Sequence, residues 1–287
     1  MKDITLEALL EAGCHFGHKS ERWHPKAAEF IWTEKDGIHI IDLAKTKSGL
    51  EAAMQFVYGL ASEGKSVLFV GTKRQARGVV HEAALAAGAA FLTQRWIGGF
   101  MTNWESVHRN IQKIKRLMEE RAVGAWKKKY PKHEQTKLSH YLDRLNVDYS
   151  GVLALDNLPS AIFVVDVRKE QSAVREAKRM EIPVIGIVDT NANPDGIDFV
   201  IPANDDAVGS VQFIVTAVTA AYQEGRELAE KEKAAAVVAA EKAAKKAAEK
   251  VEPKDMPTNL NGVVKEVKAE ETKIVEEPKK PSKSKKA

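Results

Sequence analysis

Short runs of consecutive apolar residues alternate with longer amphipathic stretches along most of the chain. Each run is bounded by glycine, proline or polar residues, which is typical of strands buried on both faces. The predicted strands are residues 66–70, 161–165, 183–188 and 199–201, and the predicted helices are residues 42–63, 73–87, 170–180 and 206–224. Residues 30–32 and 38–41 flank a turn and predict a β-hairpin. The alternation indicates an α/β fold, a mostly parallel sheet with helices on both faces.

One segment, residues 103–149, interrupts this alternation. It contains two stretches in which apolar residues are spaced by four, three and four positions. These residues are Val107, Ile111, Ile114 and Met118, followed by Leu138, Leu142, Leu145 and Tyr149. Two narrow apolar stripes joined by a short turn predict an inserted antiparallel coiled-coil hairpin. The alternative is that both helices pack on the sheet like the others.

The C-terminal part of the chain differs in composition from the rest. The last aromatic residue is Tyr222, and residues 225–250 are rich in Ala, Lys and Glu, which favour helix. Beyond residue 251, prolines interrupt a Lys/Glu-rich run that has too little apolar surface to fold. We therefore expect an α/β domain over residues 1–224 and a tail over 225–287, helical at first and then disordered.

Charge is distributed unevenly along the 287 residues. The 44 Lys and Arg outnumber the 40 Asp and Glu by only four. Residues 105–149 nevertheless carry a net charge of +5 and residues 150–224 one of −6, while residues 1–224 are neutral in total. A neutral body with a basic middle and an acidic flank indicates contact with an anion on one side. Random scatter of solvated charges is the alternative.

Composition excludes several other classes of protein. No apolar stretch is long enough for a transmembrane helix, and the acidic, amphipathic N-terminus is unlike a secretory signal. The single cysteine, Cys14, excludes an internal disulfide and a cysteine-based zinc site. These observations predict a cytoplasmic protein with no membrane partner.

Residues 59–66 match the phosphate-loop pattern G-x4-G-K-S. That chemistry requires a strand before the loop and a helix after it, whereas here a predicted helix precedes and a predicted strand follows. We therefore expect a helix end and no nucleotide site. The chain also lacks the common hydrolase and metalloprotease motifs, so no catalytic residue, required cofactor or small-molecule substrate is predicted.

Three groups of residues are candidates for contact with RNA. The first follows a buried strand and opens a helix, the second lies in a loop with two glycines and two tryptophans, and the third lies on the hairpin. Cations at these places suit phosphate contacts, and flexible aromatic loops allow close approach to the backbone. The candidates are Lys73, Arg74, Arg77, Arg95, Trp96, Asn103, Arg109, Lys113, Arg116, Lys127, Lys128 and Lys129.

Acidic residues follow the last two predicted strands. The loop from Asp189 begins like a calcium loop but has Pro194 where glycine is needed. Because strand-end loops converge, we consider a divalent ion held by His18, Asp189 and Asp205. Helix capping and turn formation are the alternative roles for these residues.

The chain closely resembles the bacterial small-subunit ribosomal protein two family. Seven blocks carry the resemblance, in order, over most of the body: residues 9–26, 38–46, 68–74, 95–104, 158–166, 182–191 and 194–206. Only the tail after residue 224 lies outside them.

The resemblance implies a flavodoxin-like sheet with an inserted coiled-coil hairpin and a place between the head and body of the small ribosomal subunit. It implies contacts to small-subunit rRNA and neighbouring proteins, a part in docking ribosomal protein one, and no enzymatic activity. From the residues alone, two alternative functions stay open: a nucleotide-dependent α/β enzyme and a free-standing coiled-coil scaffold.

Overall fold

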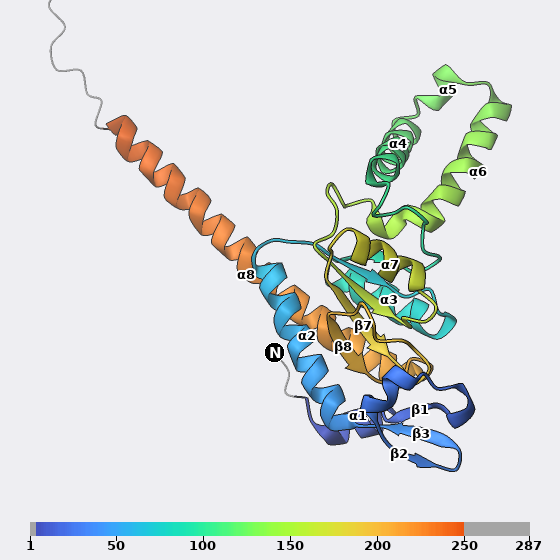
Figure 1. Ribbon diagram of the computed structural model, residues 1–287. Helices are drawn as coiled ribbons and strands as arrows, with labels where there is room; N and C mark the ends of the chain where they lie inside the picture. Colours follow the sequence, from blue (N-terminus) through green and yellow to red (C-terminus); the bar gives the residue numbers. More distant parts are fainter. Residues whose placement is uncertain (1–3, 250–287) are drawn as a thin grey trace, which may run out of the picture. The chain divides into compact units, whose positions relative to one another are not determined.

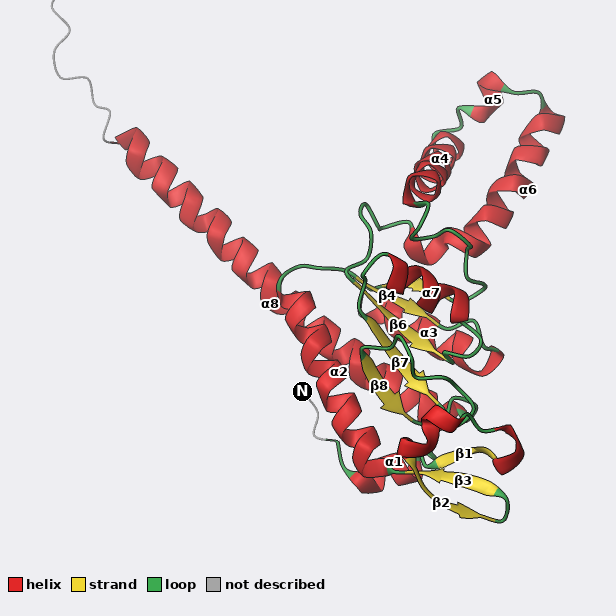
Figure 2. Ribbon diagram, in the orientation of Figure 1, coloured by secondary structure: helices red, strands yellow, loops and turns green. Residues whose placement is uncertain are grey.

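The computed structural model describes the backbone of residues 4–249 and the side chains of residues 4–232 (Figure 1). Within these residues, a five-stranded parallel sheet is accompanied by a three-stranded antiparallel sheet (Figure 2). The predicted α/β class with a parallel sheet is therefore confirmed.

The parallel sheet is built from short, fully or largely buried strands. They are β4 (Val67–Val70), β5 (Ala90–Leu92), β6 (Ala161–Val165), β7 (Val184–Val188) and β8 (Phe199–Pro202), in the spatial order β5-β4-β6-β7-β8. Counted along the chain the order is 2-1-3-4-5, so the winding direction reverses at β4. The sequence analysis missed β5, whose apolar run is only a few residues long and directly follows a helix end at Gly88.

Side chains alternate across this sheet and enter two separate cores. Phe69 and Phe163 belong to the core formed with α1 (Leu6–Glu11), α2 (Leu43–Ser62), α3 (Arg74–Ala86) and α8 (Val208–Glu249). Leu68 and Ile162 belong to the core formed with α4 (Trp104–Ala122), α6 (Lys132–Tyr149) and α7 (Gln171–Arg179). Successive residues of a strand point to opposite faces, so helices cover both faces of the sheet.

The small sheet has the order β1-β3-β2 and lies next to the N-terminal helix α1 (Figure 2). Its strands are β1 (Phe16–Lys19), β2 (Ile31–Lys35) and β3 (Ile38–Ile41), with short 3-10 helices over Ser20–Arg22 and Pro25–Phe30. Asp36 and Gly37 both have positive φ, the geometry of a tight hairpin turn. The predicted hairpin is confirmed, whereas β1 was missed because its sequence has no run of apolar residues.

Helices α4 and α6 run side by side, with the short helix α5 (Trp126–Lys129) at the end away from the sheet (Figure 1). Val107, Ile111 and Ile114 are buried, as the spacing predicts. The seam continues through Leu117, which is 5% exposed, whereas Met118 is 39% exposed. Placing Met118 in the seam was therefore wrong by one residue. The drift of a 3.6-residue helix relative to strict four-three spacing accounts for the difference.

The last helix, α8, extends to Glu249, in line with the helix propensity of the Ala/Lys/Glu-rich segment. Its first part is buried under the sheet through Val211, Ile214 and Val218, as predicted for residues 206–224. The expected domain boundary at 224/225 falls within this helix, while the first compact unit of the chain ends at Ala235. The expected disorder beyond residue 251 lies outside the described residues. Across the described part, none of the helices has the length and apolar character needed to cross a membrane.

Neighbouring residues in α4 provide a test of the seam. We expect Leu117→Ala to lower the free energy of unfolding by about 2–4 kcal/mol, because a buried leucine leaves a cavity. Met118→Ala should cost less, at most about 1 kcal/mol, since more than a third of that side chain is exposed to solvent. Urea unfolding followed by circular dichroism measures both values. Equal effects would show that the seam runs through Met118 as well.

Candidate functional site

The loops at the carboxyl ends of four parallel strands converge on a cluster of charged side chains. Lys73 follows β4, Asp166 follows β6, Asp189 follows β7, and Asp205 with its neighbour Asp206 follows β8. His18 joins them from β1 of the small sheet. We call His18, Lys73, Asp166, Asp189, Asp205 and Asp206 the acidic cluster.

Close packing of the backbone brings His18 into this cluster. A Cβ atom on Gly17 would lie 2.7 Å from Cγ2 of Thr190, so only glycine lets β1 approach the loop after β7 this closely. The backbone amide of His18 also donates to Oγ1 of Thr190 at 2.9 Å. The small sheet is thus fixed against the edge of the large one.

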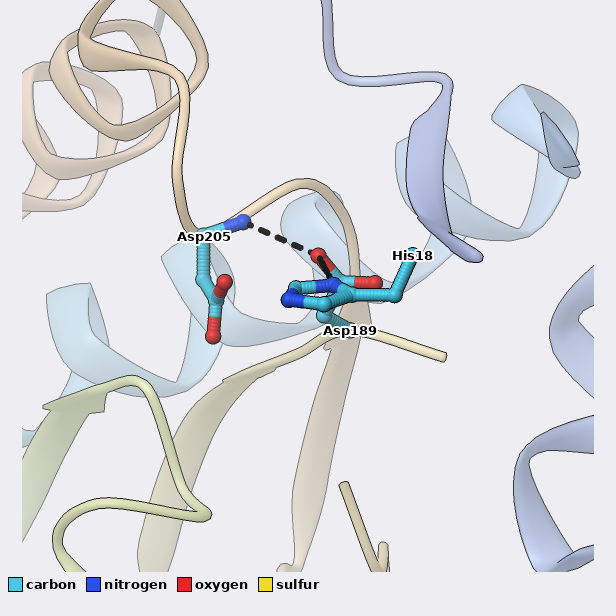
Figure 3. A group of neighbouring side chains, drawn as sticks. All are labelled: His18, Asp189 and Asp205. Carbon is cyan, nitrogen blue, oxygen red and sulfur yellow. Dashed lines mark hydrogen bonds and ion pairs between the residues drawn. The ribbon is translucent and has the colours of Figure 1, made fainter. Parts of the chain in front are cut away.

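His18, Asp189 and Asp205 lie together, as predicted (Figure 3). Their potential ligand atoms are within 4.8 Å of one another. His18 Nδ1 is 3.1 Å from Asp189 Oδ2, and its Nε2 is 3.2 Å from Asp206 Oδ2. Asp189 and Asp205 are each 1% exposed, so two carboxylates are buried side by side.

The titration behaviour of the cluster follows from this crowding. Burial, together with the carboxylates of Asp189 and Asp166, raises the pKa of Asp205 to about 7. The hydrogen bond to Asp189 raises the pKa of His18 above its usual value. Four carboxylates face one lysine and one histidine, so the cluster retains excess negative charge while its carboxyl groups are ionised.

Lys73 neutralises part of that charge. Its Nζ lies 2.8 Å from Asp205, 2.7 Å from Asp206 and 3.3 Å from Asp166. Burial lowers the pKa of Lys73, but the hydrogen bonds to Asp205 and Asp206 outweigh it and hold the pKa above its usual value. The structure therefore places this candidate RNA contact in an internal ion-pair network, with a side chain only 14% exposed.

The glycine-rich loop between β5 and α4 is held by a single carboxylate. Glu176 of α7 accepts hydrogen bonds from the indole Nε1 of Trp96 at 3.0 Å and from three backbone amides. The amides are those of Gly99, Met101 and Thr102, at 2.8, 3.1 and 3.4 Å. Burial raises the pKa of Glu176, but these hydrogen bonds outweigh it and hold the pKa below its usual value. Sequence reasoning missed Glu176, which looks like any surface acid of an amphipathic helix.

The other candidate cations near the sheet are exposed at its carboxyl edge. Arg74 and Arg77 lie in the first turn of α3, and Arg77 donates to the carbonyl oxygens of Thr72 and Gln94 at 3.4 Å. Arg95 forms an ion pair with Asp148 at 2.6 Å. Asn103 precedes α4 and is exposed, with no capping hydrogen bond from its side chain.

The cations of the hairpin are exposed along α4 and α5. Arg109, Lys113 and Arg116 recur at helical spacing on α4, and Lys113 lies 4.8 Å from the ring centroid of Tyr141. Lys127 and Lys128 are exposed on α5, whereas Lys129 forms an ion pair with Glu120 at 2.9 Å. The hairpin cations therefore remain largely available for an external anion.

Neither a phosphate loop at residues 59–66 nor a reactive Cys14 finds support among the described residues. Residues 59–66 span the last turn of α2 and its connection to β4, so the helix-before-strand order that argues against a phosphate loop is confirmed. Cys14 is buried, which raises the pKa of its thiol, and the ring of His15 stacks on Phe16. A buried, protonated thiol is a poor nucleophile.

Comparison with known proteins identifies the chain. The family described as Ribosomal protein S2 matches residues 9–225. The protein named small ribosomal subunit protein uS2 of Coprothermobacter proteolyticus is 48% identical over 227 residues, which cover 79% of this chain and 84% of that protein. The uS2 protein of Koribacter versatilis is 44% identical over 80% of this chain and 76% of that protein. The uS2 protein of Chloroflexus aggregans is 45% identical over 77% of this chain and 93% of that protein.

Fold, site and relatives together define a structural protein of the small ribosomal subunit that takes part in translation and is not an enzyme. The chain belongs to the ribosomal protein S2 family, uS2. The resemblance noted in the sequence is therefore confirmed. As a small-subunit protein it binds ribosomal RNA and other ribosomal proteins.

The role of Glu176 is open to a direct test. We expect Glu176→Gln to speed amide exchange at Gly99 and Met101 at least tenfold and to lower stability by about 1–3 kcal/mol, because charged acceptors form the stronger hydrogen bonds. Hydrogen exchange followed by mass spectrometry, with urea unfolding, measures both effects.

Glu119→Gln, on the exposed face of α4, is the matched control and should change neither quantity. A carboxyl group whose pKa is lowered by folding stabilises the fold fully at a pH above its ordinary pKa. This stabilisation is lost as the pH falls through the lowered pKa of the folded state. The difference between the Glu176→Gln variant and the unchanged chain should therefore shrink below about pH 4. An unchanged exchange rate at Gly99 would contradict this role.

Proposed function

We propose that this chain binds small-subunit rRNA through the exposed cations of the hairpin and of the neighbouring sheet edge. The observation that carries the proposal is the row Arg109, Lys113 and Arg116 on α4, continued by Lys127 and Lys128 on α5. Residues four and three apart share one helix face, so these side chains form a strip that can follow a phosphate backbone.

The sheet edge extends this surface with Arg74, Arg77 and Arg95, and the adjoining loop offers Asn103. Phosphate contacts of this kind fix the position of a protein on RNA without reading its sequence. RNA shape would therefore supply the specificity. Lys73 is left out of the proposed surface because its charge is compensated within the acidic cluster.

We further propose that the chain lies between the head and body of the small subunit and helps to dock ribosomal protein one. Large apolar side chains exposed near the N-terminus support a protein contact there. They include Phe16, Trp23 and Trp32, which are 49%, 42% and 74% exposed. These residues lie in or beside the small sheet, on a different part of the chain from the cations of α4 and α5.

Two finer features of the architecture belong to the same proposal. The strand order 2-1-3-4-5 supports a flavodoxin-like sheet, with residues 103–149 as an inserted coiled-coil hairpin. The family match ends at residue 225, which supports a ribosomal domain over residues 1–224 and a separate tail over 225–287.

Charge reversal on α4 tests the RNA contact. We expect the combined change Arg109→Glu, Lys113→Glu and Arg116→Glu to reduce incorporation into the small subunit, because each substitution replaces a phosphate-binding cation with an anion. Each lost phosphate contact also lowers the slope of log affinity against log salt by about one unit. Sucrose-gradient sedimentation of cell lysates, with the variant detected by antibody, measures incorporation.

The matched control reverses Lys65, Lys178 and Arg179, three exposed cations at the ends of α2 and α7, and makes the same change in net charge. Circular dichroism confirms that both variants are folded. Equal incorporation of the α4 variant and the unchanged chain would refute the assignment of this surface. Absence of the unchanged chain from the small-subunit peak at low salt would refute the ribosomal function itself.

A second proposal concerns the acidic cluster, where His18, Asp189 and Asp205 would hold one divalent ion. The proximity of three potential ligand atoms and the excess of carboxylates over cations support it. An imidazole with two carboxylates is a ligand set that zinc accepts. Such an ion would neutralise part of the carboxylate charge that Lys73 now neutralises.

Calorimetric titration of the full chain with Zn²⁺ tests this second proposal. We expect one ion per chain, with binding weakened at least tenfold by His18→Ala, since loss of a ligand removes a coordination bond. His133→Ala, at an exposed position of α6, is the control and should leave binding unchanged. Equal binding by the His18→Ala variant would place the ion elsewhere and reject the site.

A further inference from the structure

A second feature of the carboxyl edge is a crevice beside the acidic cluster, with a volume of about 390 Å³. It is bounded by the loops that follow β4, β5 and β6 and by the start of α7. Its lining includes Arg77, Arg95, Trp96, Lys169, Glu170 and Ser172. This volume lies within the range of sites that hold a small molecule or a single nucleotide.

The position of the crevice in the fold favours ligand binding. The strand order reverses at β4, and the crevice lies where the loops after β4 and β6 diverge. In open α/β sheets, ligands bind at this reversal point, outside the carboxyl ends of the strands. Helices α3 and α7 both begin here, and neither has a capping hydrogen bond from the side chain before its first residue.

The lining is positively charged. Arg77, Arg95 and Lys169 all contribute to it, and the amine of Lys169 donates to the carbonyl oxygen of Thr72 at 3.0 Å. Arg77 likewise bonds to carbonyl oxygens, so its positive charge is not compensated by a carboxylate in the crevice. Within the described part of the chain, Arg95 forms an ion pair with the Asp148 side chain on α6, while Lys169 acts electrostatically on the buried Glu170.

The single acidic residue in the lining adds little negative charge. Glu170 is 3% exposed and accepts a hydrogen bond from the hydroxyl group of Thr72. Burial raises the pKa of Glu170, which favours the neutral carboxyl group. The crevice therefore combines exposed cations with a buried polar group.

The wall formed by the loop after β5 suits a nucleotide better than a bare anion. Trp96 presents a half-buried ring whose orientation is fixed by the hydrogen bond to Glu176. Nothing lies within 4 Å of the place where a Cβ atom on Gly98 would be, so the backbone is open to close approach. Aromatic rings of this kind stack on unpaired bases, whereas cations hold the phosphate.

We propose that this crevice holds one unpaired nucleotide of ribosomal RNA, with its phosphate near Arg77, Lys169 and the start of α7 and its base near Trp96. The inference rests on the proposed RNA-binding function and adds Lys169 and Ser172 to the contact surface. It also gives a function to Lys169, a cation of the otherwise acidic segment 150–224.

Binding of fluorescein-labelled decauridylate to the full chain, followed by fluorescence anisotropy, tests the proposal. Ser172→Glu adds a negative charge and bulk to the crevice, while glutamate near the start of a helix favours the fold. We expect it to weaken binding at least tenfold. Lys169→Gln should lower the slope of log affinity against log salt by about one unit, as expected for one lost phosphate contact.

The matched control is Ser48→Glu on the exposed face of α2, which packs in the opposite core. It should change decauridylate affinity less than twofold. Binding by the Ser172→Glu variant within twofold of the unchanged chain would overturn the proposal. Thermal unfolding confirms that each variant is folded, so loss of binding is not mistaken for loss of structure.

Competition experiments distinguish the possible ligands. Displacement of decauridylate by uridine monophosphate, but not by inorganic phosphate or deca-glutamate at equal concentration, supports a nucleotide site. Equal displacement by phosphate would show an anion site only. Equal displacement by deca-glutamate would show an acidic-peptide site. Either result would overturn the proposal. Sedimentation with the small subunit is scored separately, so failure of the crevice is distinct from failure of the RNA-binding function.

Discussion

The ammonium group of Lys73 lies among the carboxylates of Asp166, Asp205 and Asp206, and these four residues follow three different strands of the parallel sheet. A buried carboxylate without a partner costs several kcal/mol, and removing one member of such a network typically costs about 3–5 kcal/mol. Through His18 the same network also reaches the small sheet. The relative placement of the strand-end loops, and so of the acidic cluster and the crevice that they form, depends on this arrangement.

The internal use of carboxylates also determines which charges remain on the surface. Asp189, Asp205 and Glu170 are buried, and Glu176 is occupied by the loop that begins the hairpin. Much of the negative charge of segment 150–224 is therefore not available to an external partner. The net charge of this segment predicts an acidic flank, yet its exposed residues include Arg168 and Arg175 at the same edge of the sheet.

The strands and helices were predictable where periodicity was strong. Continuous apolar runs predict buried strands such as β6 and β7, and an apolar face predicts the first part of α8. The short strands β1 and β5 were missed, because three or four residues carry too little pattern to stand out; pairing with β3 and β4 defines them in the structure. The seam on α4 was also misplaced by one position, since the buried residue there is Leu117 and not the predicted Met118.

The candidate site was predictable in part for similar reasons. The convergence of Asp189 and Asp205 followed from the rule that carboxyl ends of parallel strands meet at one edge. His18 joins them from the antiparallel small sheet, which this rule does not cover. The environment of Lys73 did not follow, because a lysine after a strand looks the same in sequence whether it faces solvent or three carboxylates. Glu176 was missed because its hydrogen-bond partners are more than 70 residues away.

The contact between His18 and the loop after β7 has a consequence for the order of events during synthesis. The amide of His18 and its Thr190 partner are separated by 172 residues. At a synthesis rate of about 5–20 residues per second, the N-terminal strand emerges roughly ten to thirty seconds before the loop that secures it. During that interval side chains that the folded chain buries, such as Ile41, cannot reach their final packing. The N-terminal segment therefore waits undocked until residue 190, about two-thirds of the way along the chain, has left the ribosome that makes it.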